Sequence, residues 1–236
     1  MAEGLVIGRR FNGPPDSAQG GYACGRFALE AAGPLGSGRA VVTLHEPPPL
    51  DAPMRSVVAG GRVHFWHGEI LVASVSRAGT PIETVPFVAP EAVAAAEHRY
   101  VGADRHPFAG CFVCGPGRAD GLGLSPGPMS PGRTGCRWTP DPSLGATAGT
   151  PVPVEFGWAA LDCPGGWTVD LAATPMVLSR FSAEIIDPPV VGTGYLVVGR
   201  RDAVDGHTLT TTTALYRRDG VLAGRALARW VRTAVV

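Results

Sequence analysis

The order of predicted elements narrows the choice of fold more than any other property of the sequence. One helix followed by a block of strands occurs twice, with the helices at residues 22–32 and 154–163. The strands are expected at 40–45, 54–59, 62–66 and 70–77 in the first block, and at 177–186, 194–201, 208–217 and 222–232 in the second. This order indicates an α+β fold in which a helix packs on one face of each antiparallel sheet. It excludes a parallel α/β fold, which needs helices and strands in alternation.

The repeat divides the 236 residues into two units, and each unit is long enough for a small domain. A short Ala-rich helix at 90–98 leads into a join near residues 100–106. We therefore expect an N-terminal domain at 1–103 and a C-terminal domain at 104–236.

Local signals set the expected ends of the two main helices. The pair Gly20-Gly21 opens the first helix, and Asp16 or Ser17 is a plausible N-cap. Pro164 is expected to stop the second helix, because proline has no N–H to donate. Before that helix, a Gly/Pro-rich stretch at 115–132 is expected to be irregular, with a short strand near 135–138.

Charge and composition exclude several classes of function. The chain has 20 cations and 20 anions, so no basic face is available for nucleic acid or anionic lipid. All the cations are arginine, and the absence of lysine excludes Schiff-base chemistry and a Walker-type phosphate site. Residues 1–10 lack a basic region followed by a long apolar run, so we expect no secretory signal there, and the sequence has no apolar run of about 18 residues. We expect a cytoplasmic protein with reduced cysteines and no nucleic-acid or membrane partner.

Three short motifs resemble a known family. The segment Cys111-Phe-Val-Cys-Gly115 with Gly121-Leu-Gly-Leu124 resembles the opening of PaaI-like hot-dog thioesterases. The segment Trp158-Ala-Ala-Leu-Asp-Cys-Pro-Gly-Gly-Trp167 resembles their central helix. In the first half, Gln19-Gly-Gly21 stands where such enzymes carry His-Gly-Gly, and Asn12 stands near the position of their loop asparagine.

The resemblance implies a double hot-dog fold, with two long central helices that are each wrapped by an antiparallel sheet. The two sheets would pair edge to edge and form a pseudo-dimer within one chain, which could pair further as a homo-oligomer. The implied substrate is a small acyl thioester, with CoA as part of the substrate and no separate cofactor or metal.

The candidate site combines residues from both halves. Thioester hydrolysis builds negative charge on the carbonyl oxygen, and the N–H groups of Gly20 and Gly21 at a helix N-terminus are suited to hold it. Asp162 in an apolar helix is the best candidate for a nucleophile or general base. Gln19 and Asn12 would position the carbonyl group or the water molecule.

The family's sites lie between two units, with glycine from one and the acid from the other, so we expect one composite site per chain. The second site would be degenerate. The first helix has Ala28 and Leu29 where the acid is usual, with Glu30 nearby, and Pro153-Val-Glu155 replaces His-Gly-Gly in the second half.

Simpler interpretations stand beside this one. Asp162 could cap its own helix, Gly20-Gly21 could be an ordinary turn, and Asn12 is more typical of a turn than of catalysis. The missing histidine of His-Gly-Gly favours an alternative function, a non-catalytic acyl- or CoA-binding protein. It also argues against a dehydratase on the same fold, which needs a histidine beside the acid.

The cysteines offer a third possibility. Cys111 and Cys114, with His106 and Cys136, could form a four-ligand zinc set and make the protein a zinc-stabilised interaction module. One Cys-x-x-Cys alone is a weak signal, so buried reduced thiols are the preferred interpretation, and no metal is expected.

Overall fold

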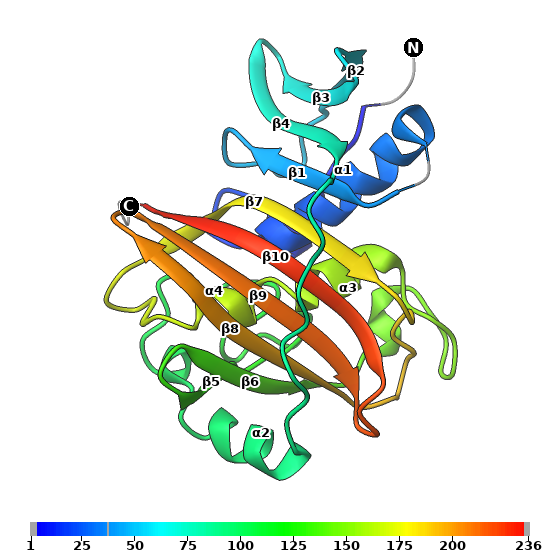
Figure 1. Ribbon diagram of the computed structural model, residues 1–236. Coiled ribbons are helices and arrows are strands. Elements are labelled where there is room, and N and C mark those ends of the chain that lie inside the picture. The colour runs from blue at the N-terminus through cyan, green and yellow to red at the C-terminus, as the bar shows by residue number, and fades with distance from the viewer. Residues whose placement is uncertain (1–3, 37, 234–236) are drawn as a thin grey trace.

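The computed structural model describes residues 4–36 and 38–233 and contains one antiparallel sheet of ten strands. Across the sheet the strand order is β2-β3-β4-β1-β7-β10-β9-β8-β6-β5 (Figure 1). The strands are β1 (Ala40–Leu44), β2 (Arg55–Ala59), β3 (Arg62–His67), β4 (Ile70–Arg77), β5 (Gly127–Ser130), β6 (Arg133–Trp138), β7 (Met176–Ile185), β8 (Tyr195–Asp205), β9 (Thr208–Arg217) and β10 (Leu222–Arg232). The helices are α1 (Gly20–Leu35), α2 (Pro90–Glu97), α3 (Val154–Ala160) and α4 (Cys163–Gly166), with short 3-10 turns at Arg9–Phe11, Val101–Ala103 and Pro142–Leu144. The predicted α+β class is confirmed.

The two halves of the sheet join at one strand pair. β1 and β7 run antiparallel, with Val42 opposite Phe181 and Thr43 opposite Arg180. The Ser182 hydroxyl adds a hydrogen bond of 2.7 Å to the backbone oxygen of Ala40. The four strands of the first half therefore continue the sheet of the second half, in the predicted edge-to-edge arrangement.

The first central helix, α1, is longer than predicted and has a different cap. It begins at Gly20 and ends at Leu35, and its N-cap is Gln19, whose side-chain oxygen accepts a hydrogen bond of 2.7 Å from Tyr22 N. Neither Asp16 nor Ser17 is the cap, because a turn in which Gly13 N bonds to Ser17 O precedes the helix. Phe27 on the buried face packs against Phe65 of β3, with ring centroids 4.6 Å apart.

The second central helix is broken rather than long. α3 ends at Ala160, and α4 begins at Cys163. The prediction that Pro164 stops the helix was wrong in position, because Pro164 lies in the first turn of α4, where a missing N–H is tolerated. Two buried threonines satisfy carbonyl groups near the break: Thr213 bonds to Leu161 O and Thr134 bonds to Pro164 O, each at 2.6 Å. The break places Asp162 between the two helices.

The strands of the second half are buried on both faces. The segment between β4 and α2 crosses the face of β9 and β10 opposite α3 and α4 (Figure 1), and Tyr216 donates a hydrogen bond of 2.6 Å to Val85 O on this crossing. Val85 and Val93 pack there against Leu196 and other side chains of β8 and β9. This second cluster explains why β8 begins with a continuous apolar run, Tyr195–Val198, instead of a strict alternation.

α2 lies against the second half, although the sequence places it in the first. The carboxylate of Glu97 accepts hydrogen bonds from the backbone and the guanidinium of Arg137 on β6. The division of the chain at residue 103 stays a prediction. The structure also adds β5, which the sequence did not predict because its four residues include Pro128.

No helix within residues 4–36 and 38–233 is long and apolar enough to cross a membrane.

Candidate functional site

Asp162 lies at the centre of the contact between the two halves. Its side chain is buried, with 2% exposure, at the break between α3 and α4. One carboxylate oxygen, Oδ2, accepts hydrogen bonds from Gln19 Nε2 at 2.5 Å and from Gly21 N at 2.8 Å. The other oxygen, Oδ1, is also buried and has no hydrogen-bond partner within the described part of the chain. The carboxylate of one half therefore meets the helix N-terminus of the other.

Glycines of α1 allow this close contact. A Cβ atom on Gly21 would lie 2.5 Å from the Cβ atom of Asp162, and one on Gly25 would lie 2.8 Å from Cα of Glu155. Such distances are far shorter than a normal van der Waals contact. Because Gly21 and Gly25 are one turn apart, they share a face of α1, and α3 packs directly against that face. The sequence signal for this contact is the four-residue spacing of Gly21 and Gly25, which places both on one face of a helix.

The environment of Asp162 acts on its pKa in both directions. Burial raises the pKa of Asp162, the nearby Cys111 adds to the rise, and the net value is about 7. The hydrogen bonds from Gly21 and Gln19 lower it, since they stabilise the charged form. The N-terminus of α1 also favours a negative charge at this position.

The structure places the predicted site residues in two groups. Gln19, Gly20 and Gly21 lie at the start of α1 beside Asp162, and a Cβ atom on Gly20 would be 3.4 Å from Asp162 Oδ2. Asn12 lies in the turn before them, and its side-chain oxygen accepts a hydrogen bond of 2.6 Å from Arg118. Among the hydrogen bonds of the described residues, none joins Asn12 to Asp162.

The second carboxylate considered in the sequence, Glu30, is exposed on α1. The structure therefore brings together four of the predicted site residues: Gln19, Gly20, Gly21 and Asp162.

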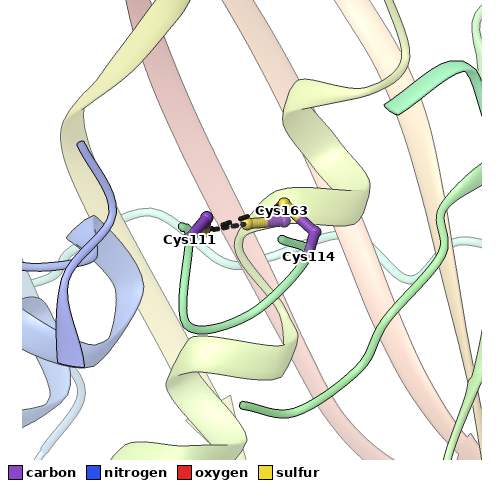
Figure 2. Close-up of side chains that lie close together, drawn as sticks. All are labelled: Cys111, Cys114 and Cys163. Atoms are coloured by element: carbon purple, nitrogen blue, oxygen red, sulfur yellow. Dashed lines mark hydrogen bonds between the residues drawn. The ribbon is translucent and has the colours of Figure 1, made fainter. Parts of the chain in front are cut away.

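Three cysteines form a buried cluster next to Asp162. The sulfurs of Cys111, Cys114 and Cys163 all lie within 4.8 Å of one another (Figure 2). Cys163 directly follows Asp162 and is the first residue of α4, so the cluster adjoins the candidate site. The Cys136 suggested by the sequence as a metal ligand lies on β6, outside this cluster. Cys163 was missed because no spacing in the sequence connects it to Cys111 and Cys114.

Among the residues that the structure describes, one cavity lies away from Asp162. It has a volume of about 130 Å³ and lies at the ends of β8 and β9, where Met176, Leu209 and Arg232 contribute to its lining. None of the predicted site residues lines it.

Comparison with known proteins gives matches only at the level of structure. No protein-family profile and no curated protein sequence matches this chain. A hot-dog protein from Alicyclobacillus acidocaldarius superposes with a TM-score of 0.57 at 15% identity, over 93% of this chain and 89% of that one. The acyl-CoA thioesterase II TesB2 from Mycobacterium marinum gives a TM-score of 0.59 at 10% identity, over 92% and 90%. The dehydratase domain of a mycocerosic acid synthase-like polyketide synthase gives 0.62 at 17%, over 97% and 89%.

These identities are low, so the likeness is one of fold and does not by itself assign an activity. The matches extend over most of both chains, and two strand-and-helix halves share one sheet in this structure. The protein therefore has the hot-dog fold, in its double form within a single chain.

Proposed function

We propose that this protein hydrolyses acyl thioesters, with acyl-CoA as the substrate class. The observation that carries the proposal is the contact of the buried Asp162 carboxylate with Gln19 and Gly21 from the other half of the chain. A carboxylate beside N–H donors at a helix N-terminus contains the two parts that thioester hydrolysis needs, a base or nucleophile and a site for the oxyanion. The likeness of the fold to an acyl-CoA thioesterase supports the substrate class.

The proposed reaction uses one composite site. In one route Asp162 removes a proton from water while the water oxygen attacks the thioester carbonyl carbon; the N–H groups of Gly20 and Gly21 stabilise the oxyanion, and the intermediate then expels the thiolate, which takes up the proton. In the other route Asp162 attacks that carbon directly and the thiolate leaves, so that an anhydride with Asp162 forms. Water then hydrolyses the anhydride, which releases the carboxylic acid, restores the Asp162 carboxylate and supplies the proton for the thiolate. To bind substrate, Gly21 N must exchange its hydrogen bond to Asp162 Oδ2 for one to the carbonyl oxygen.

Gln19 fits a positioning role in this reaction. Its amide donates to Asp162 but, unlike a histidine, it transfers no proton at neutral pH. In this reaction the water molecule would bind Asp162 Oδ1 once substrate binding opens the site, since Oδ1 is buried in the structure and Oδ2 already holds two donors. For Asn12 we propose only that it stabilises the turn before α1, because its side-chain oxygen accepts a hydrogen bond from Arg118.

The alternative function is a non-catalytic acyl- or CoA-binding protein. The observation that favours it is that the Gln19 amide and the Gly21 N–H are both already bound by Asp162. A dehydratase function is disfavoured, because the hydrogen bonds of Asp162 within the described residues include none from a histidine.

The test is a hydrolysis panel from acetyl-CoA to long-chain and aromatic acyl-CoAs, on wild type and Asp162→Asn in parallel. We expect Asp162→Asn to lose about 10²- to 10⁴-fold in kcat/KM, as is typical when a general base is removed. Asp187→Asn is the matched control and should retain activity, because Asp187 is a partly exposed carboxylate after β7 that lies 3.9 Å from Arg217.

Full activity of Asp162→Asn on every hydrolysed thioester would contradict the composite site. No turnover by wild type, together with acyl-CoA binding in calorimetry, would instead support the binding protein. Thermal unfolding of both variants separates a loss of chemistry from a loss of fold.

Two further predictions from the sequence belong to this proposal. The first is a cytoplasmic location, where cysteines stay reduced; the five cysteines form no disulfide in the structure. The second is that chains pair into a homo-oligomer, and size-exclusion chromatography with light scattering would measure the oligomer's mass.

A further inference from the structure

The three clustered cysteines come from two segments that are far apart in the sequence. Cys111 and Cys114 lie in the loop before the Gly/Pro-rich stretch, and Cys163 begins α4. Their residues are 5%, 3% and 7% exposed. Figure 2 shows the three side chains pointing toward one another from the loop and from the helix. The fold therefore brings three sulfur atoms together in an interior position.

The spacing of the sulfurs fits a shared metal ion. Cys111 Sγ lies 3.8 Å from Cys114 Sγ and 3.9 Å from Cys163 Sγ. In a tetrahedral zinc site with Zn–S bonds of about 2.3 Å, two sulfurs lie about 3.8 Å apart. A disulfide joins only two sulfurs, at about 2.05 Å, and would leave the third one alone. All three sulfurs lie within 4.8 Å of one another, so a single ion between them could contact all three after a small adjustment.

His106 lies beside the cluster and is the candidate for a fourth ligand. Its Nε2 atom is 3.2 Å from Cys114 Sγ, but the ligand atoms that all lie within 4.8 Å of one another are the three sulfurs without His106, so the ring must move toward the sulfurs to complete a tetrahedral site. The His106 ring packs edge-on against Trp167 at 5.2 Å between centroids. The ring Nδ1 accepts a hydrogen bond of 2.9 Å from Phe108 N, which puts the proton of the neutral ring on Nε2. Binding through Nε2 therefore shifts this proton to Nδ1 and releases Phe108 N–H.

The surroundings of the cluster contain N–H donors that suit thiolates. The buried Nε1 of Trp167 has no hydrogen-bond partner of normal geometry among the described residues. Trp167 lies beside the cluster, since its ring contacts the ring of His106, whose Nε2 is 3.2 Å from Cys114 Sγ. Gln19 Nε2 lies 3.7 Å from Cys163 Sγ. Donors of this kind around the ligands are common in metal sites, where they stabilise the charge on sulfur.

We propose that Cys111, Cys114 and Cys163 bind one zinc ion as thiolates, and that His106 Nε2 moves in from beside Cys114 as the fourth ligand. Binding releases three thiol protons to solvent, and no electron transfer takes place. Three sulfurs and one imidazole in a closed, buried set are typical of a structural site. The ion fixes the loop of residues 106–114 to the first turn of α4, directly beside Asp162.

The first experiment is metal analysis of the full chain, purified with a reductant and without chelators. We expect about one zinc ion per wild-type chain, as for a structural site, and a loss of most of it in Cys163→Ser. Cys24→Ser and Cys136→Ser are matched controls, because these buried cysteines lie on α1 and β6, outside the cluster, and should keep the zinc. This measurement needs no substrate, so it is independent of the thioesterase proposal.

A second measurement uses the wild type alone, in case Cys163→Ser does not fold. Zinc is removed with a chelator, and cobalt is then added in steps. We expect a thiolate-to-cobalt charge-transfer band that saturates at about one equivalent and is abolished by zinc, because both ions take the same tetrahedral ligands.

Wild type that contains no stoichiometric metal and gives no cobalt band would overturn the proposal, as would a disulfide among the three cysteines in the purified protein. In His106→Ala we expect weaker cobalt binding and a changed ligand-field spectrum. An unchanged spectrum in that variant would overturn the assignment of the fourth ligand.

Discussion

At the scale of single residues, Gln19 connects the two halves through both ends of its amide group. The oxygen accepts the hydrogen bond from Tyr22 N that caps α1, and the nitrogen donates to Asp162 Oδ2. The side chain is buried, with 2% exposure, so neither hydrogen bond is replaced easily by water. One residue thus fixes the start of a helix and holds the candidate catalytic acid.

We expect Gln19→Ala to lower the free energy of unfolding by about 2–4 kcal/mol, because it removes a helix cap and leaves a buried carboxylate with one donor fewer. Asp141→Ala is the matched control: Asp141 caps a short 3-10 turn by accepting from Ser143 N, in an exposed position. Losing that cap should lower the stability by less than about 1 kcal/mol. Urea denaturation measures both variants. Equal effects would mean that the buried contact with Asp162 adds nothing to stability.

At the scale of elements, the contact of α1 with α3 depends on the absence of side chains on one face of α1. The Cβ atom that Gly25 lacks would lie 2.8 Å from Cα of Glu155, a backbone atom that cannot rotate away. Alanine has the higher helix propensity, so propensity alone would favour it at this position. The close packing of the two helices is therefore the reason for glycine here.

We expect Gly25→Ala to destabilise the protein by about 1–3 kcal/mol, since overpacking forces the helices apart. Gly33→Ala in the same helix is the control, because no atom lies within 4 Å of the added Cβ position. That change should alter the stability by less than about 1 kcal/mol, because the better helix propensity of alanine is offset by the contact of its Cβ with the ring of the following Pro34. The difference between the two variants can be read from the shift in the thermal midpoint of unfolding. A stabilising effect of Gly25→Ala would contradict the close contact.

At the scale of the whole molecule, the two halves share a sheet and a core. One cluster of buried side chains extends from Phe27 and Phe65 in the first half to Leu215 and Trp230 in the second. Full burial of a large apolar side chain contributes about 1.5–3 kcal/mol, so cores that are continuous across the halves couple their stabilities. The antiparallel pair β1–β7 and the packing of α2 on β5 and β6 add to this coupling.

We therefore expect a single cooperative unfolding transition in scanning calorimetry. The unfolding enthalpy of a chain of this length is roughly 160 kcal/mol near 60 °C, and the van't Hoff enthalpy should equal it. Two separable transitions, each with about half of that enthalpy, would show that the halves unfold independently.

The sequence by itself determined the elements and their class. The three strands at 70–77, 208–217 and 222–232 begin and end where the sequence predicts, because alternating or β-branched runs between tight turns depend on local interactions. The α+β class follows from the order of these elements. The resemblance to hot-dog thioesterases also selected Gln19, Gly20, Gly21 and Asp162, which lie together in the structure.

The tertiary structure alone decided which distant residues meet. The break at Asp162 depends on buried threonines of β6 and β9, which donate hydrogen bonds to carbonyl oxygens at the break and which no local sequence pattern identifies. β5 forms a strand because it pairs with β6. The choice of Cys163 over Cys136 in the sulfur cluster depends on how the loop of residues 106–114 packs against α4. The contacts of Thr213 with Leu161 and of Cys111 with Cys163 each join residues 52 positions apart. They escape sequence analysis because burial and packing, not local propensity, fix them.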